Sequence, residues 1–320
     1  RVNPATKDYL RNNNIGTLRP LDPELVLQVD TKRDSLVFLD NATNELSDPS
    51  LVNCRFVNYD SYEAIKAERN GRILTLTMSR PGTLNAVDAL LHEELSRIFY
   101  DVNADHDVDV VILTGEGNAF CAGGDLQWLN DMHGDPSAFA LTVWEGKRLV
   151  NGLLDLEKPI IARLPGHAIG LGCTIALYCD IIYAAEEAKL GDPHVAVGLV
   201  AGDGGAVIWP QLIGYARAKE YLMTGDTLSA AKAAEIGLIN HAVPADQLDE
   251  AVNAMAERLA GGAINAIKWT KASVNAGLKQ AANAVLDTAF NFEAMSQMTK
   301  DHKIATEAFL NKEKPKFTGN

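Results

Sequence analysis

GHAIGLGCTIALYCDIIYAAEEAKLGDPHVAVGLVAGDGG, residues 166–205, is the stretch from which the fold is predicted. It reads as a turn, a helix, a strand, and a second glycine-rich turn that leads into another helix. A β-branched run at 160–164 precedes it and predicts a buried strand. The glycines of the first turn allow a sharp bend and a close approach to a ligand. The helix expected over 174–179 begins with unpaired N–H groups, so the stretch predicts a site for negative charge at a loop–helix junction.

The regions on either side of this stretch continue an alternation of strands and helices. Before it, we expect strands at 72–78 and 108–114 and helices at 86–103 and 137–156, with a glycine-rich loop at 115–124. This order is typical of an α/β core with parallel strands. After residue 205 the pattern is helical, over 216–223, 229–236, 245–259, 263–276 and 280–310, with Ser229 and Asp246 as N-caps and Gly237 as a stop.

The composition excludes several classes of partner. The formal net charge of −13 leaves no basic face for a nucleic acid. No apolar run reaches the roughly 18 to 20 residues that span a bilayer, so we expect no membrane partner. The four cysteines lack CxxC spacing, which favours reduced, buried thiols and a cytoplasmic location. No metal motif is visible, and no GxGxxG follows a strand, so we expect neither a metal nor a nicotinamide cofactor.

The chain divides into three predicted regions. Residues 1–60 are an N-terminal extension of unknown role, with short apolar runs at 25–29 and 36–39. Residues 61–255 form the core, and residues 256–320 form a helical region that serves oligomerisation or acts as a lid.

Five segments of residues 61–320 together carry a family resemblance. They are SRPGTLNA at 79–86, FCAGGDL at 120–126, GHAIGLGCTIALYCD at 166–180, GDPHVAVGLVAGDGG at 191–205 and LMTGDTLSAAKAAEIGLINHAV at 222–243. In this order and spacing the chain resembles the enoyl-CoA hydratase/isomerase, or crotonase, superfamily. The resemblance implies an α/β fold with a spiral of ββα turns and a helical C-terminal trimerisation region. It also implies a homotrimer or a dimer of trimers.

The resemblance further implies an acyl-CoA thioester as ligand, with coenzyme A as part of the substrate and no tightly bound cofactor. The backbone N–H groups of Gly124 and Leu171 would form an oxyanion hole for the thioester enolate. The implied coenzyme A contacts are Arg80, Leu84, Ala86 and the late lysine Lys314, with Lys312 and Lys316 beside it. The implied walls of the acyl pocket are Trp128, His133, Trp144 and Thr174.

The sequence departs from the family at the two positions where hydratases carry glutamates. Thr174 stands at the first position and His194 at the second, and Gln127 replaces a lysine that is common in hydratases. A threonine hydroxyl has no accessible anionic form near neutral pH, so hydration by a glutamate pair is not expected. His194 can transfer a proton. Asp203 would act as a base, orient the histidine or attack as a nucleophile, with a helix N-cap as the structural alternative.

Other polar residues receive structural interpretations. We expect Asp125 and Asp180 to cap or brace loops, His167 to pack, and Glu145 to lie on a polar helix face. Asp192 is either the orienting partner of His194 or a turn residue.

Three functions remain open. The first is hydratase, lyase or isomerase chemistry on an acyl-CoA, with His194 and Asp203 as the catalytic residues. The second is a carbon–carbon hydrolase acting on a β-diketone, or a decarboxylase. The third is an acyl-CoA binding protein without activity, since one fold carries many chemistries.

Overall fold

The computed structural model describes residues 25–30, 35–40, 57–80 and 82–320, and it divides into two compact units. The first unit contains β1 (Leu25–Asp30) and β2 (Ser35–Asp40), which pair antiparallel and coincide with the two short apolar runs of the sequence. The rest of the predicted N-terminal extension, with Cys54, lies outside the described residues. The second unit, residues 59–103 and 107–320, holds the predicted core and the C-terminal helices.

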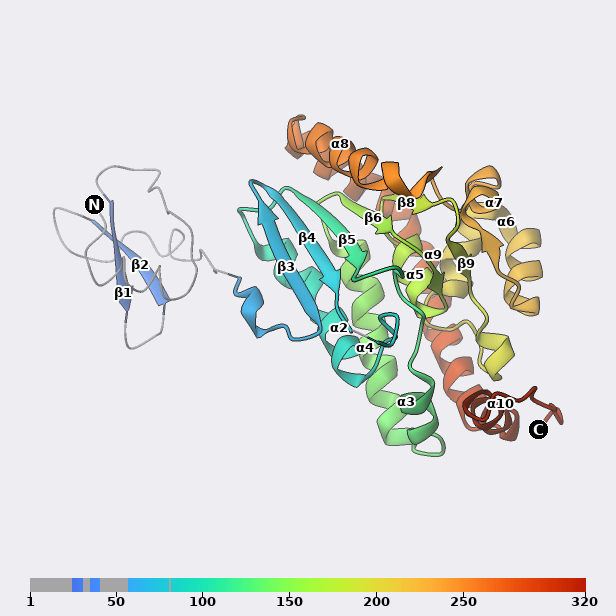
Figure 1. Ribbon diagram of the computed structural model, residues 1–320. Helices are drawn as coiled ribbons and strands as arrows, with labels where there is room; N and C mark the ends of the chain where they lie inside the picture. The colour runs from blue at the N-terminus through green and yellow to red at the C-terminus, as the bar shows by residue number, and fades with distance from the viewer. Residues whose placement is uncertain (1–24, 31–34, 41–56, 81) are drawn as a thin grey trace. The chain divides into compact units, whose positions relative to one another are not determined.

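A six-stranded sheet forms the centre of the second unit, in the order β11-β8-β6-β5-β4-β3 (Figure 1). Its strands are β3 (Ile65–Asn70), β4 (Ile73–Met78), β5 (Val110–Gly115), β6 (Ile160–Leu164), β8 (Ile181–Ala185) and β11 (His241–Val243). All neighbouring strands are parallel except the β3–β4 hairpin at one edge. The predicted parallel α/β core is therefore confirmed. β3 was not expected, because its sequence IKAERN has no apolar alternation.

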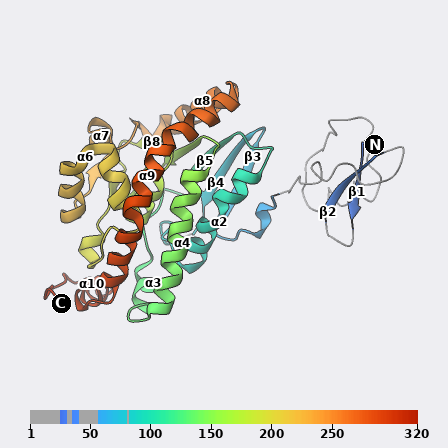
Figure 2. The same cartoon turned by 180° about the vertical axis from the view of Figure 1, so that it is seen from behind.

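The two faces of the sheet bury different residues. Leu74, Leu113 and Ala162 belong to the large core on one face, and the neighbouring Ile112 and Ile161 belong to a smaller cluster on the other. This alternation is the period-two pattern of strands buried on both sides. Helix α8 (Leu248–Ala260) packs in the smaller cluster through Leu248, Val252 and Ala256. Figure 2 shows α2, α4 and α9 over the opposite face.

Most of the helices lie where the sequence predicted helical segments, but several of their boundaries differ from the predicted ones. They are α2 (Ala89–Ala104), α3 (Leu126–Asp131), α4 (Pro136–Asp155), α5 (Leu171–Leu177), α6 (Gly205–Thr224), α7 (Ala230–Glu235), α9 (Ile264–Gln297) and α10 (Lys300–Leu310), besides α8. Short 3₁₀ turns are η2 (Tyr59–Ser61), η3 (His194–Val197) and η4 (Ala245–Gln247). The helices expected at 263–276 and 280–310 have a different division, because α9 runs through Gly277 and the break falls at Thr299. There the Thr299 hydroxyl accepts a hydrogen bond from His302 N and caps α10.

The other helix boundaries have local causes. Ser229 caps α7, and Gly237 follows its end with φ +80°, both as expected. Asp246 does not cap α8, because it lies inside η4 and the cap position is Gln247. Among the described residues no helix is long and apolar enough to cross a membrane.

A second, three-stranded sheet, β10-β9-β7, holds the loops that the sequence singled out. Its strands are β7 (Ala168–Ile169), β9 (Lys189–Gly191) and β10 (Leu228–Ser229). β7 leads directly into α5, and β9 leads into the turn that carries His194. The small sheet therefore brings the two glycine-rich turns of residues 166–205 to one place.

Candidate active site

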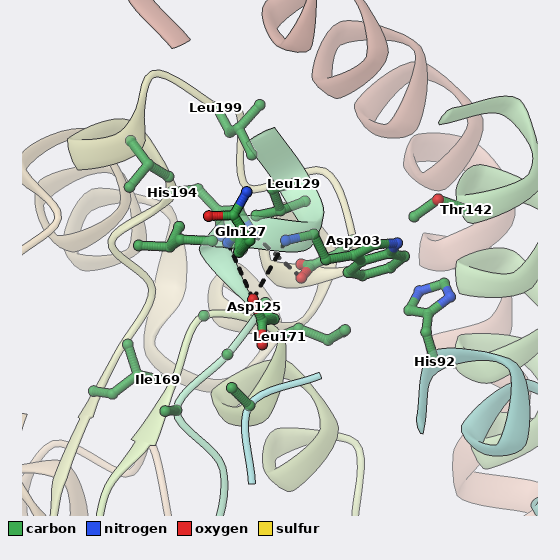
Figure 3. A pocket seen from close by; sticks show the side chains of 18 of the residues that line it. His92, Asp125, Gln127, Leu129, Thr142, Ile169, Leu171, His194, Leu199 and Asp203 are labelled. Atoms are coloured by element: carbon green, nitrogen blue, oxygen red, sulfur yellow. Dashed lines mark hydrogen bonds and ion pairs between the residues drawn. The ribbon is translucent and has the colours of Figure 1, made fainter. Parts of the chain in front are cut away.

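A cavity of about 490 Å³ lies among both glycine-rich loops, the His194 turn and the C-terminal helices (Figure 3). Most of its wall is apolar or glycine. Its lining residues include Thr83, Ala86, His92, Gly124, Trp128, Phe139, Thr142, Val143, Leu171, His194, Asp203, Phe290, Glu293, Phe309 and Leu310. A concave, largely apolar cavity with a few converging polar groups is the usual form of a small-molecule site.

The two glycine loops lie directly against each other at the cavity. Cys121 and Ala168 form an isolated parallel bridge, and a Cβ atom at Gly123 would lie 2.8 Å from the Ile169 carbonyl oxygen. Only glycine permits this approach. Leu171 is the first residue of α5, and among the described residues neither its N–H nor that of Gly124 donates a hydrogen bond. Two free backbone donors therefore face one cavity.

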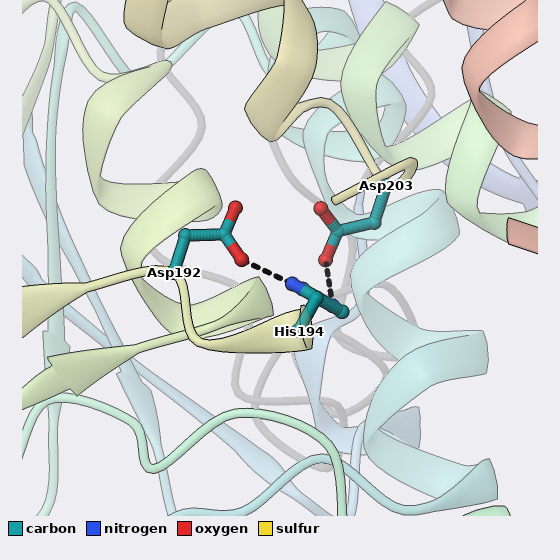
Figure 4. A group of neighbouring side chains, drawn as sticks. All are labelled: Asp192, His194 and Asp203. Carbon is teal, nitrogen blue, oxygen red and sulfur yellow. Dashed lines mark hydrogen bonds and ion pairs between the residues drawn. The ribbon is translucent and has the colours of Figure 1, made fainter. Parts of the chain in front are cut away.

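His194 is held between two carboxylates (Figure 4). It is the first residue of η3, and its Nδ1 forms a very short hydrogen bond with Asp192 Oδ1. Its Nε2 lies 3.4 Å from Asp203 Oδ2. A Cβ atom at Gly170 would lie 3.7 Å from His194 Cε1, which places the imidazole beside the first glycine-rich turn. Asp192 is therefore the orienting partner of His194, which settles the alternative that the sequence left open.

Asp203 is fixed in the turn before α6. Its Oδ1 accepts hydrogen bonds from the Thr174 hydroxyl at 3.1 Å and from Gly205 N at 3.5 Å. A Cβ atom at Gly205 would overlap Asp192 Oδ2, so glycine at this position brings the two carboxylates close. Asp203 is not the N-cap of α6, because Gly204 occupies that position. Thr174, which stands in place of the first glutamate, acts as a donor to Asp203.

Glu293 is a fourth ionisable group at this end of the cavity, and the sequence analysis missed it. It comes from α9 and is buried, and its Oε2 has no hydrogen-bond partner among the described residues. A Cβ atom at Gly202 would lie 2.6 Å from Glu293 Cβ, so the turn that carries Asp203 packs directly on α9. Nothing in the sequence signals this contact, because it depends on how a distant helix docks.

The surroundings shift the pKa values of these groups in opposite directions. Burial alone lowers the pKa of His194, but the charges of Asp192 and Asp203 and their hydrogen bonds outweigh burial and raise it well above 6.5. Burial raises the pKa of Asp203, yet the His194 charge and the hydrogen bonds to Asp203 bring it below 3.8. Burial and the neighbouring Asp203 carboxylate raise the pKa of Glu293 well above 4.5. The surroundings thus favour the protonated form of His194, the ionised form of Asp203 and the neutral form of Glu293.

These charges bear on metal binding. Asp192, His194 and Asp203 offer ligand atoms within 4.8 Å of one another. Both nitrogens of His194, however, face carboxylates, and a protonated imidazole has no lone pair for a metal. The arrangement therefore favours an ion triad of Asp192, His194 and Asp203 over a metal site.

A second histidine and a second carboxylate lie elsewhere on the cavity. His92 on α2 lines it, and its Nδ1 is 2.7 Å from Glu145 Oε2 on α4. Both residues are buried, so the expectation that Glu145 lies on a polar helix face is wrong. The Trp128 ring packs 5.4 Å from the His92 ring. Sequence reasoning missed His92, since a histidine on an amphipathic helix carries no local sign of its partner.

The residues predicted for the acyl pocket separate into two groups. Trp128 lines the cavity. His133, Trp144 and Thr174 are not among its lining residues: the His133 ring packs 5.9 Å from that of His302, Trp144 is 55 % exposed with the Arg148 guanidinium over its ring, and Thr174 lies fully buried behind Asp203. Trp144 and Thr174 lie on helices that the sequence predicted, but the rotation of these helices turns both side chains away from the cavity wall, and His133 lies in the turn after α3.

Of the four predicted coenzyme A contacts, one is among the residues that line the cavity. Ala86 lines it; Leu84 does not line it and is 53 % exposed, with φ +53°. Arg80 is engaged by Asp88 at 2.8 Å and Asp125 at 3.5 Å. Lys314 is exposed and follows Phe309 and Leu310, which line the cavity.

The residues expected to brace the loops do so. Asp125 caps α3 by accepting from Gln127 N and Trp128 N. Asp180 accepts from Ile160 N at 2.7 Å and pairs with Lys271. His167 Nδ1 accepts from Lys189 N at 2.9 Å, which ties the first turn to β9. Cys121, Cys173 and Cys179 are free and buried.

Comparison with known proteins agrees with this architecture. Residues 68–320 match the family model described as enoyl-CoA hydratase/isomerase. The chain is 32 % identical to the probable enoyl-CoA hydratase echA8 of Mycobacterium bovis over 81 % of its own length and 99 % of the relative's. An enoyl-CoA hydratase/isomerase structure from Mycobacterium paratuberculosis has 37 % identity and a TM-score of 0.75, covering 78 % of this chain and 99 % of that one.

A third similar protein has a different described activity. It is a beta-diketone hydrolase from the cyanobacterium Anabaena, solved with bound (S)-3-oxocyclohexyl acetic acid. It is 31 % identical, with a TM-score of 0.70, and the match covers 75 % of this chain and 96 % of that one.

Proposed function

The chain belongs to the enoyl-CoA hydratase/isomerase family, and from that premise we propose that it adds water to a carbonyl substrate through an enolate. The observation that carries the proposal is the imidazolium–carboxylate pair of His194 and Asp203, in which His194 occupies the position of the second hydratase glutamate and Asp203 accepts a hydrogen bond from Thr174 at the position of the first. The pair provides an acid and a base side by side.

The N–H groups of Gly124 and Leu171 are proposed to hold the substrate's carbonyl oxygen. They face the same cavity and donate no hydrogen bond within the described part of the protein. Their loops are locked together by the Cys121–Ala168 bridge, so the donors need no rearrangement as charge develops. One such prearranged donor lowers the barrier of acyl transfer reactions by about 3–4 kcal/mol.

The roles of the proton-transfer pair follow from their charges. Asp203 keeps its carboxylate at neutral pH and is proposed to take a proton from water. His194 keeps its proton and is proposed to give it to the carbon next to the carbonyl. Asp192 touches the imidazole on its far nitrogen and acts as a positioning residue. The raised pKa of Glu293 favours its neutral form, so Glu293 adds no further negative charge beside the His194–Asp203 pair.

An α,β-unsaturated acyl-CoA is the first proposed substrate class, with coenzyme A as part of the substrate. The names of the relatives support this, as does the cavity mouth beside Thr83 and Ala86, where the family places its early coenzyme A loop. Because Asp88 and Asp125 already neutralise Arg80, we assign the phosphate contacts to Lys312, Lys314 and Lys316 rather than to Arg80. Leu84 and Ala86 are proposed to border the adenine.

A β-diketone is the second proposed substrate class, favoured by the replaced glutamates and by the similarity to the Anabaena hydrolase. Water activated by Asp203 would add its oxygen to one carbonyl carbon. The bond between that carbon and the central carbon would break, and its electron pair would form an enolate held by the two N–H groups. His194 would then protonate the central carbon, which yields a carboxylic acid and a ketone.

The chain is also proposed to assemble as a trimer or dimer of trimers. In the isolated protomer Trp269, Phe292 and Met295 on α9 are 66 %, 54 % and 66 % exposed. Exposed large apolar side chains on one helix favour contact with another copy. Light scattering of the purified chain tests this, and a monomer at micromolar concentration would contradict it.

The test of function is a mass-spectrometric turnover screen. It offers saturated, α,β-unsaturated, aromatic and β-keto acyl-CoAs, together with cyclic β-diketones without coenzyme A. We expect a product heavier by one water from an unsaturated thioester. Turnover of the diketones alone would select the second substrate class, and a decarboxylated β-keto product would replace both. Binding of thioesters with no product in any reaction would instead support a binding protein without activity.

A further inference from the structure

We propose that the cavity has a second recognition point, His92 Nε2–H, which binds a carbonyl or carboxylate oxygen at the end of the substrate away from the reacting carbonyl. The inference rests on the proposed function, because it takes the reacting carbonyl to lie at Gly124 and Leu171. In Figure 3 His92 and Thr142 lie on one side of the cavity, opposite Ile169 and His194. A substrate held at the reacting end therefore extends toward His92.

The His92–Glu145 pair is built into the protein and is not a surface contact. His92 is 3 % exposed and Glu145 is 7 % exposed, and they come from two different helices. Nδ1 of His92 is used by Glu145. Within the part of the chain that the structure describes, Nε2 has no hydrogen-bond partner, while His92 itself lines the cavity.

The protonation of the pair determines what Nε2 can bind. A buried carboxylate without a neutralising partner is costly, and within the described residues Glu145 forms its ion pair with His92. Arg148, one helical turn away, instead stacks on the rings of Tyr100 and Trp144. Two arrangements leave the pair neutral overall: an imidazolium with a carboxylate, or a carboxylic acid that donates to Nδ1. Both place a hydrogen on Nε2, so this nitrogen of a cavity-lining residue can act as a donor.

The surroundings of this donor restrict its partner. Trp128, Phe139, Val143 and Phe290 supply apolar wall. The Thr142 hydroxyl donates to the Ala138 carbonyl at 3.3 Å. A purely hydrocarbon group here would leave Nε2–H unpaired in an apolar environment, which costs binding free energy. An oxygen acceptor would pair with it, so the preferred substrate carries a second carbonyl or a carboxylate on a short carbon skeleton.

The experiment measures binding of compounds that cannot react by the proposed chemistry. Calorimetry compares hexanoyl-CoA with 5-oxohexanoyl-CoA and with adipoyl-CoA, at several chain lengths, and cyclohexanone with 3-oxocyclohexyl acetic acid. We expect the oxygen-bearing member of at least one pair to bind about 10- to 100-fold more tightly, the range of a hydrogen bond to a charged group. His92→Phe, which retains the packing on Trp128, should remove this preference, and Glu145→Gln should reduce it.

A matched control and a rescue variant complete the test. His241→Phe alters a histidine that stacks on Tyr183 at 4.4 Å and does not line the cavity, and it should leave the preference unchanged. If His92→Phe does not fold, His92→Gln retains an N–H donor and should keep part of the preference. Equal binding of both members of every pair by the wild type, no binding of any, or a preference that survives in His92→Phe would each overturn the inference.

The same experiment separates this inference from the proposed function. A binding preference without turnover of any substrate would contradict the water-addition chemistry and leave the second recognition point standing. Turnover of unsaturated thioesters without any preference for a distal oxygen would do the reverse.

Discussion

Two histidines line one cavity, and they differ in how many carboxylates hold them. His194 lies between Asp192 and Asp203, whereas among the described residues the carboxylate on His92 is that of Glu145. Two carboxylates outweigh the cost of burying the imidazolium and raise the pKa of His194 well above 6.5. One carboxylate can share a proton with its histidine and still leave the pair neutral. The first arrangement suits a proton donor, and the second suits recognition of an oxygen atom.

The largest expected effect comes from removing the base of the reacting end. Asp203→Asn keeps the shape of the side chain and its contact with Thr174 but cannot take a proton from water. We expect kcat to fall by about 10²- to 10⁴-fold, the usual contribution of a positioned acid or base. The measurement is kcat on the substrate that the turnover screen identifies.

The control for this variant is Asp226→Asn, which changes an exposed aspartate after α6. Its kcat should equal that of the wild type. If Asp203→Asn also keeps full activity, Asp203 is not the base. The second carboxylate that distinguishes His194 from His92 would then take no part in catalysis.

The next effect tests whether two carboxylates are needed at His194. Asp192→Asn removes one of them and should lower kcat/KM about 10- to 100-fold, as expected for the loss of a charge-assisted hydrogen bond. The wild-type profile should be flat around neutral pH. It should fall at low pH as Asp203 gains a proton, with a pKa below 3.8, and at high pH as His194 loses one, with a pKa above 6.5.

The sign of the shift distinguishes a charge effect from a packing effect. Loss of the Asp192 charge lowers the pKa of His194, so the alkaline limb of kcat/KM should move to lower pH. Asp192→Glu, which keeps the charge, should leave the limb nearer its original position. An alkaline limb that does not move in Asp192→Asn would contradict the role given to the second carboxylate.

A smaller effect concerns the hydrogen bond that holds Asp203. Thr174→Val keeps the side-chain volume but removes the hydroxyl that donates to Asp203 Oδ1 at 3.1 Å. This hydrogen bond lowers the pKa of Asp203, so its loss should move the acid limb of the profile to higher pH. We expect about a fivefold loss of kcat/KM. Thr114→Val, which removes a hydroxyl bonded to the Arg163 carbonyl far from the cavity, should shift neither limb.

The sequence predicted the loop residues of the cavity but not the polar residues that its helices contribute, for a physical reason. Gly124, Leu171, His194 and Asp203 were identified through the family resemblance, which rests on glycine turns and loop–helix junctions that are local features, and the structure brings all four to one cavity. Their roles remain predictions.

His92, Glu145 and Glu293 lie on three separate helices, α2, α4 and α9. Their place on the cavity depends on how each helix is rotated against the sheet and against the others. The same rotation explains why Trp144 points to solvent although its helix was predicted correctly. Helix packing is set by contacts distant in the chain, which one sequence does not reveal.

The smallest expected effect is on stability and concerns Glu293, the ionisable group of α9. Burial and the Asp203 charge raise its pKa in the folded chain well above the ordinary value of 4.5. The folded protein therefore keeps this proton to a higher pH than the unfolded chain does. By linkage, the contribution of Glu293 is fully present below pH 4.5 and is lost as the pH rises toward its folded pKa. Glu293→Gln cannot ionise in either state, so it should remove this loss and gain on the order of 1 kcal/mol relative to wild type near pH 8.

Urea unfolding from pH 4.5 to pH 8 measures this effect. The difference in unfolding free energy between Glu293→Gln and the wild type should grow with pH, while the exposed Glu220→Gln on α6 should show no such difference. A difference that stays constant with pH would mean that Glu293 is ionised beside Asp203. The reacting end would then carry three carboxylates around one imidazolium, and His194 would be held by charge on three sides.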